Sequence, residues 1–167
     1  MKRLFLLCTT AALLAACATT DSAERQRRQA GITRRLADSI QARSLTVDID
    51  MMHTQRGGSN YVSPEFYLRL QGDSVFSYLP YFGRAYTVPY GGGKGLDFQA
   101  PVMDYKAGEG RKGATRITFT ARNEEDEYRF SLDVFGNGKA YLHVSPQNRE
   151  QISYDGSIDL NDKEVKR

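Results

Sequence analysis

The sequence is poor in the residues that most often carry metal and thiol chemistry. Its 167 residues contain no tryptophan, two cysteines and two histidines. Both cysteines, Cys8 and Cys17, lie near the amino terminus, so the rest of the chain has no thiol for a disulfide, a cysteine nucleophile or a cysteine-ligated metal. A zinc site needs more ligands than His53 and His143 can supply. We therefore expect no metal and no other cofactor.

The first residues have the features of an export signal. Met1-Lys2-Arg3 supplies positive charge, an apolar run follows over residues 4–14, and Leu14-Ala15-Ala16-Cys17 ends it. This last motif resembles the lipobox of bacterial lipoproteins, in which the chain is cut before the cysteine and lipid is attached to its sulfur. The apolar run is too short and too rich in threonine and alanine for a membrane-spanning helix. The motif predicts a signal peptide at residues 1–16 and a membrane anchor through lipid on Cys17.

The lipobox resemblance also bears on location. Ala18 stands where an aspartate marks inner-membrane retention in enteric lipoproteins. We therefore expect an outer-membrane lipoprotein that faces the periplasm or the cell surface.

Residues 17–43 differ in charge from the remainder of the chain. They hold six arginines and three acidic residues, whereas acidic residues are in slight excess beyond them. Nucleic-acid binding would need basic and aromatic residues together on the folded domain, so we expect no nucleic-acid partner. Ile32, Leu36 and Ile40 recur every four residues, which predicts that the arginine-rich linker becomes helical.

From residue 44 the apolar period changes to two. Leu45, Val47, Ile49 and Met51 alternate with polar residues, as in a half-buried strand. Similar segments follow at residues 66–70, 75–81, 96–102, 117–121, 128–134, 140–144 and 152–160. Turn-length connections between them leave no room for parallel crossovers. The pattern predicts a β-rich domain over residues 44–167, an antiparallel meander of about eight strands that forms a small barrel or curved sheet with one N-terminal helix; a β-sandwich is the alternative.

Several segments between Leu45 and Leu160 resemble a known family. They are Asn60-Tyr61-Val62-Ser63-Pro64, Leu79-Pro80-Tyr81-Phe82-Gly83-Arg84-Ala85-Tyr86, Gly91-Gly92-Gly93, Gly95-Leu96-Asp97-Phe98, Asp104-Tyr105-Lys106 and Val144-Ser145-Pro146. The chain is similar to domain-of-unknown-function family 4251, short envelope lipoproteins largely from Bacteroidetes. The resemblance implies lipoprotein status and a β-rich fold, and it carries over no functional residues.

The stretch from Leu79 to Lys94 is the most distinctive candidate for function. It combines aromatic side chains with glycines and two cations, and a loop longer than about 12 residues in a compact domain is often functional. Tyrosines offer flat, partly polar contact surfaces, and an arginine can bind a carboxylate or phosphate through two hydrogen bonds. The candidate binding residues are Tyr81, Phe82, Arg84, Tyr86, Tyr90 and Lys94. A structural flap over one end of the sheet is the alternative.

Other polar groups have simpler explanations. His53 and His143 are expected to face solvent, although either could meet Asp50 or Asp133 across the sheet. The acidic run Glu124-Glu125-Asp126-Glu127 is expected to be a solvated hairpin tip.

Three functions remain open. The favoured one is a noncatalytic module that binds an amphipathic ligand inside the barrel, or a glycan or envelope protein on the tyrosine-rich loop. A hydrolase using Asp, Glu and Tyr is the second, in which Asp48 and Asp50 could pair as acid and base. A structural subunit of an envelope complex is the third. We expect no enzymatic activity.

Overall fold

The described residues form a curved β-sheet with a helix at one end. A computed structural model describes residues 24–84, 86 and 95–159. A helix spans residues 24–41. The strands are β1 (Ser44–Thr54), β2 (Gly58–Tyr61), β3 (Tyr67–Gln71), β4 (Ser74–Leu79), β5 (Leu96–Glu109), β6 (Thr115–Arg122), β7 (Glu127–Val134), β8 (Lys139–Pro146) and β9 (Ile152–Ile158), with a short 3-10 turn at Arg111–Gly113 between β5 and β6.

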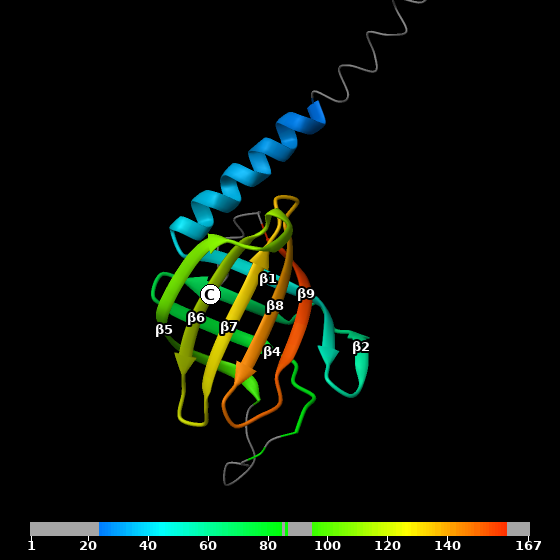
Figure 1. The fold of residues 1–167 in the computed structure, drawn as a ribbon, viewed down its shortest axis with the longest axis vertical. Helices are drawn as coiled ribbons and strands as arrows, with labels where there is room; N and C mark the ends of the chain where they lie inside the picture. The colour runs from blue at the N-terminus through cyan, green and yellow to red at the C-terminus, as the bar shows by residue number, and fades with distance from the viewer. Residues whose placement is uncertain (1–23, 85, 87–94, 160–167) are drawn as a thin grey trace, which may run out of the picture.

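The sheet closes into a barrel. Its strand order is β2-β1-β3-β4-β5-β6-β7-β8-β9, and an additional antiparallel pairing joins β1 to β9. Eight strands therefore form a ring, and β2 lies outside it on the end of β1 (Figure 1). The mostly β, antiparallel barrel with one N-terminal helix is confirmed. The β-sandwich alternative is wrong, because the β1–β9 ladder removes the free edges that two separate sheets would have.

Strand β1 departs from the predicted alternation at one point. Its pairing with β9 shifts register between Ile49 and Met51, so Asp50 is an extra residue in a β-bulge. Met52, and not the predicted Met51, is therefore the next buried residue after Ile49. Beyond the bulge, β2 pairs with the end of β1 on the edge where β3 pairs with its beginning, while β9 stays paired on the other edge as far as His53. The sequence pattern missed β2, whose four residues are all exposed.

Proline 101 lies in β5, which is a long strand with two successive partners. Residues Leu96–Pro101 pair with β4, and pairing with β6 begins at Val102. Pro101 is thus at the changeover, where its missing N–H interrupts the ladder least.

The interior of the barrel is filled by side chains. The largest fully buried residues include Tyr128, Tyr154, Phe119 and Phe130. Phe119 stacks on Phe130 with ring centroids 4.7 Å apart, and Phe98 stacks on Tyr128 at 4.4 Å. This aromatic packing occupies the space in which the sequence analysis placed an amphipathic ligand, so a binding site has to be sought outside the ring.

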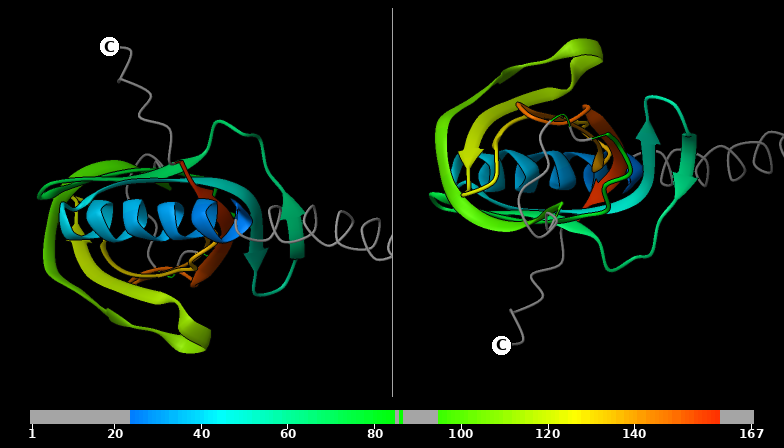
Figure 2. Two further views of the ribbon diagram at one scale, coloured as in Figure 1. Left: turned by 90° about the horizontal axis from the view of Figure 1, so that it is seen from above. Right: turned by 90° about the horizontal axis from the view of Figure 1, so that it is seen from below.

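The helix covers one end of the barrel (Figure 2). Leu36 and Ile40 are buried in the core cluster, as their four-residue spacing predicts. The Tyr105 hydroxyl donates a hydrogen bond to the Ile40 carbonyl oxygen at 2.9 Å, and the Gln29 amide donates to the Gly136 carbonyl. The helix is continuous through Gly31.

The acidic run between β6 and β7 is not simply solvated. Asp126 is 5% exposed, and its carboxylate accepts hydrogen bonds from the backbone N–H groups of Glu127, Gln147 and Asn148. Arg149, itself buried, pairs with Glu125 at 2.7 Å. The prediction of a solvated hairpin tip is therefore wrong for Asp126, because the loop after β8 folds back over that carboxylate.

Gly156 is the tightest point of the β1–β9 ladder. A Cβ atom placed there would lie 2.1 Å from the Asp48 carbonyl oxygen, which belongs to the backbone and has no way to rotate aside. We predict that Gly156→Ala lowers the free energy of unfolding by about 2 to 3 kcal/mol, as overpacking does. Urea denaturation followed by far-UV circular dichroism measures it.

Gly31→Ala is the matched control for that variant. A Cβ at Gly31 meets no atom within 4 Å, and the residue lies inside the helix. Alanine should stabilise the protein by about 0.5 to 1 kcal/mol there. Equal effects of the two substitutions would contradict the steric role assigned to Gly156.

The buried carboxylate of Asp126 gives a second prediction. Asp126→Ala leaves several buried N–H donors without an acceptor and should cost about 3 kcal/mol of unfolding free energy. Glu124→Ala, at an exposed position in the same run, should change it by less than about 0.5 kcal/mol. Chemical denaturation of both variants tests this, and similar values for the two would show that the run is solvated throughout.

Candidate functional site

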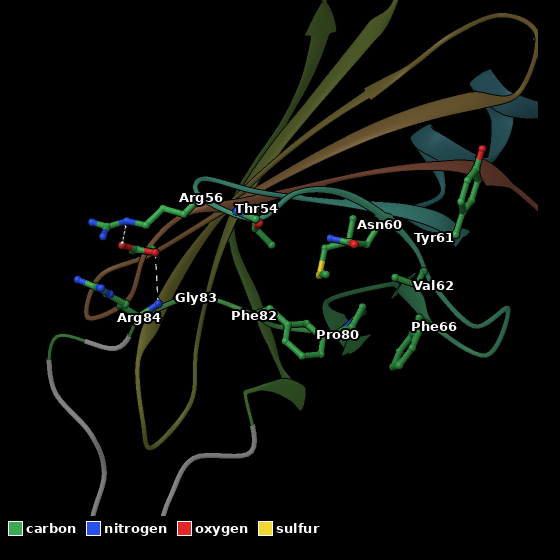
Figure 3. A pocket seen from close by; sticks show the side chains of 13 residues that line it. Thr54, Arg56, Asn60, Tyr61, Val62, Phe66, Pro80, Phe82, Gly83 and Arg84 are labelled. Atoms are coloured by element: carbon green, nitrogen blue, oxygen red, sulfur yellow. Dashed lines mark hydrogen bonds and ion pairs between the residues drawn. The ribbon is translucent and has the colours of Figure 1, made fainter.

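A groove of about 670 Å³ lies beside the arm formed by β2 and the end of β1 (Figure 3). This volume is within the range of about 300 to 1,000 Å³ that is usual for small-molecule sites. Three parts of the chain line it: the β1–β2 arm, the segment after β4, and the loop before β9. The lining residues are Met52, Thr54, Arg56, Gly57, Asn60, Tyr61, Val62, Phe66, Pro80, Phe82, Gly83, Arg84 and Glu150.

The arm forms one wall. Met52 pairs with Asn60 and His53 pairs with Ser59 across the hairpin. Because successive side chains of a strand point to opposite faces, Met52 and Asn60 share the groove face while His53 and Ser59 share the other. Thr54 closes the turn, since its hydroxyl oxygen accepts a hydrogen bond from the Gly57 N–H at 2.8 Å.

His53 fixes the arm to the barrel. Its Nδ1 lies 2.7 Å from the Ser59 hydroxyl oxygen, and its Nε2 lies 2.8 Å from the Asp155 carboxylate. These contacts join β2, β1 and β9 on the face opposite the groove. His53 is thus on the polar face as predicted, but it has specific partners, and its carboxylate partner is Asp155 rather than Asp50.

His143 makes a more local contact on the outer face of β8. One of its ring nitrogens lies 3.2 Å from the hydroxyl oxygen of Ser145, two residues along the same strand. The predicted alternative of a pairing with Asp133 is not what the structure has, because Asp133 binds the guanidinium of Arg116 through both oxygens, at 2.6 and 2.7 Å.

The second wall is the segment after β4. Pro80 ends that strand, so Tyr81 lies beyond it rather than on it as predicted. The buried Tyr154 hydroxyl donates to the Pro80 carbonyl oxygen at 2.7 Å, and the Tyr81 hydroxyl donates to the Glu150 carbonyl oxygen at 2.9 Å. Burial raises the pKa of both tyrosines, which keeps them protonated as hydrogen-bond donors. Both walls are therefore held by specific bonds to the barrel.

Charged groups gather at one end of the groove. The Glu150 side chain is 9% exposed, and one of its oxygens lies 3.4 Å from the Arg56 Nε. Its other oxygen accepts a weak hydrogen bond from the Arg84 N–H, while the Glu150 N–H donates to the Arg84 carbonyl oxygen at 2.9 Å. The opposite end carries Val62 and Phe66 (Figure 3). The groove thus runs from a charged end to an apolar end.

The predicted binding residues divide into several groups. Phe82 and Arg84 line the groove, and Phe82 is 70% exposed. Tyr81 is half-buried and supports the second wall. Tyr86 is also 70% exposed, and its N–H donates to the Asn148 carbonyl oxygen. Tyr90 and Lys94 lie outside the described residues.

Sequence reasoning missed the arm and Glu150. Residues 60–62, which belong to the arm wall, appeared only as part of the family resemblance, since β2 is too short and polar for an alternation signal. The alternation predicted Met51 on the buried face, and the bulge at Asp50 puts Met52 there instead. Nothing in the sequence around Glu150 distinguishes it from other surface acids.

The described residues offer neither a metal site nor a membrane span of helical type. They contain no group of three or more His, Cys, Asp or Glu side chains that could hold a metal ion. Within the same ranges, no helix has the length and apolar character needed to cross a membrane.

Comparison with known proteins agrees with this fold. No curated protein matches the chain. The crystal structure at 1.95 Å resolution of a DUF4251 family protein from Bacteroides eggerthii DSM 20697 is similar, with a TM-score of 0.61 and 17% sequence identity over 78% of this chain and 90% of that chain. A family model described as Domain of unknown function (DUF4251) matches residues 27–158. That match covers most of the chain and confirms the resemblance seen in the sequence: the protein belongs to the DUF4251 family.

Proposed function

We propose that the protein is a lipid-anchored module of the bacterial envelope that binds an amphipathic ligand without catalysis. The observation that carries the proposal is the groove, which combines apolar lining with charged groups at one end. Ligand sites are commonly apolar clefts with a few polar groups that fix the orientation of the ligand.

We place the proposed ligand in the groove and not in the lumen of the barrel. The lumen is packed with aromatic side chains, so the sequence-based hypothesis of a ligand inside the barrel is abandoned. Met52, Phe66 and Phe82 supply apolar surface in the groove, and an aliphatic chain laid against it would lose contact with water.

The anchor is supported by the sequence alone. Residues 1–16 have the charge and apolar run of an export signal, and Cys17 follows Leu14-Ala15-Ala16. More than one acyl chain is needed for stable membrane attachment, and lipoprotein processing supplies several. Outer-membrane location is part of the proposal, on the basis of Ala18.

Loss of the lipid should release the protein. We predict that Cys17→Ser shifts the full-length chain from the membrane pellet to the soluble fraction, whereas Cys8→Ser leaves it in the pellet. Fractionation and immunoblotting of both variants measure this. Membrane association that survives Cys17→Ser would refute the anchor.

The groove can be tested with a fluorescent reporter, because the chain has no tryptophan of its own. We predict that Phe82→Trp, in a full chain that also carries Cys17→Ser, shows a saturable blue shift of its emission when 1-dodecanol is added. The shift reflects transfer of the exposed indole to an apolar surrounding.

Tyr141→Trp is the control reporter. Tyr141 is exposed on β8, outside the groove. Its emission should not respond to 1-dodecanol. An unresponsive Phe82→Trp reporter, or equal responses of the two, would rule against the groove as a ligand site.

A further inference from the structure

We infer that the groove selects a long-chain carboxylate, with Arg56 and Arg84 binding the head group and the apolar end receiving the tail. The inference rests on the proposed function and names its ligand class. It comes from the identity and pairing of the charged side chains at one end of the groove.

The two ends of the groove differ in kind. Arg56, Arg84 and Glu150 cluster at one end, while Val62 and Phe66 lie at the other (Figure 3). Phe82 lies between them (Figure 3), and Met52 also contributes apolar lining. A ligand that matches this order has one charged end and an uncharged aliphatic body.

The charged end of the groove, where the ligand head group would bind, has a net positive charge. Two guanidinium groups and one carboxylate leave a net charge of about +1 at neutral pH, taking arginine as always charged. Glu150 is held inside the site by backbone bonds to Arg84, so its charge stays in place whether or not a ligand is bound. A ligand with one negative charge would neutralise this net charge, whereas a positively charged ligand would be repelled by the two arginines.

Both arginines have guanidinium N–H donors that are available to a ligand. Glu150 lies 3.4 Å from the Arg56 Nε, and a guanidinium carries five N–H donors, so this pairing does not use them all. Among the described residues, the guanidinium of Arg84 has no hydrogen-bond or ion-pair partner. A planar carboxylate accepts two parallel N–H bonds from such a group.

An aliphatic chain suits the body of the groove better than a peptide. An extended peptide brings an N–H and a carbonyl group at every residue, and each needs a partner when it leaves water. The groove body offers mainly apolar side chains. Its polar side chains include the Asn60 amide and the Thr54 hydroxyl, and the latter already accepts a hydrogen bond from the Gly57 N–H, so a peptide backbone would find few partners. A methylene chain makes no such demand.

The test compares two probes of equal length, dodecanoate and 1-dodecanol, on the Phe82→Trp reporter in the full chain with Cys17→Ser. Dodecanoate should bind at least about tenfold more tightly, because charge-assisted hydrogen bonds exceed neutral ones by that margin. Arg56→Gln with Arg84→Gln should remove this advantage and leave the affinity for 1-dodecanol unchanged.

Arg35→Gln is the matched control. It removes one positive charge from an exposed helix position at the end of the barrel that the helix covers, and both affinities should stay as they are. Loss of dodecanoate affinity in Arg35→Gln would mean that net charge, rather than the two groove arginines, attracts the ligand, and would overturn the inference.

The remaining outcomes separate the two proposals. Equal affinities for dodecanoate and 1-dodecanol would overturn the carboxylate inference while the binding function stands. Binding of neither probe would overturn both. A leucine-rich pentapeptide with a free carboxyl terminus is the competitor: displacement of dodecanoate at lower concentration than dodecanoate itself requires would assign the groove to peptide termini and overturn the inference.

Discussion

The ladder between β1 and β9 is the constraint on which the rest of the structure depends. It turns an open meander into a ring, and the two backbones approach so closely that only glycine fits at position 156, beside the Asp48 carbonyl oxygen. The bulge at Asp50 lies within this ladder, and beyond it β1 pairs with β9 on one edge and with β2 on the other. The arm, and with it the groove, exist because this one strand serves both the barrel and the wall beside it.

Period-two alternation was sufficient to predict the eight strands that form the ring. Each of its strands buries one face, and a fixed burial pattern specifies both strand and register. Leu68 and Leu70 in β3, or Phe130 and Leu132 in β7, illustrate how directly that signal is read. The helix followed from Leu36 and Ile40 in the same way. Closure itself needed a further argument, that long free edges are unfavourable, and the structure agrees with it.

The candidate site was less accessible from sequence for a physical reason. Its walls come from segments about 30 and 70 residues apart, and no local period relates Arg56, Arg84 and Glu150. Phe82 and Arg84 were found because an aromatic and glycine-rich loop is unusual in itself. Asp126 was misread because an acidic run signals solvent exposure unless another loop, here the one after β8, supplies its N–H groups. Hydrogen bonds from a loop that is distant in the sequence cannot be recognised from the acidic run itself.

The way in which the arm is attached to the barrel separates the local stability of β2 from the global stability of the ring. Strand β2 hydrogen-bonds to β1 alone, through four residue pairs, whereas each ring strand has neighbours on both sides. Local opening of a segment costs only the contacts of that segment. Strand β2 can therefore open and re-form while the eight-stranded ring stays intact, so its amide protons are expected to exchange with solvent independently of global unfolding.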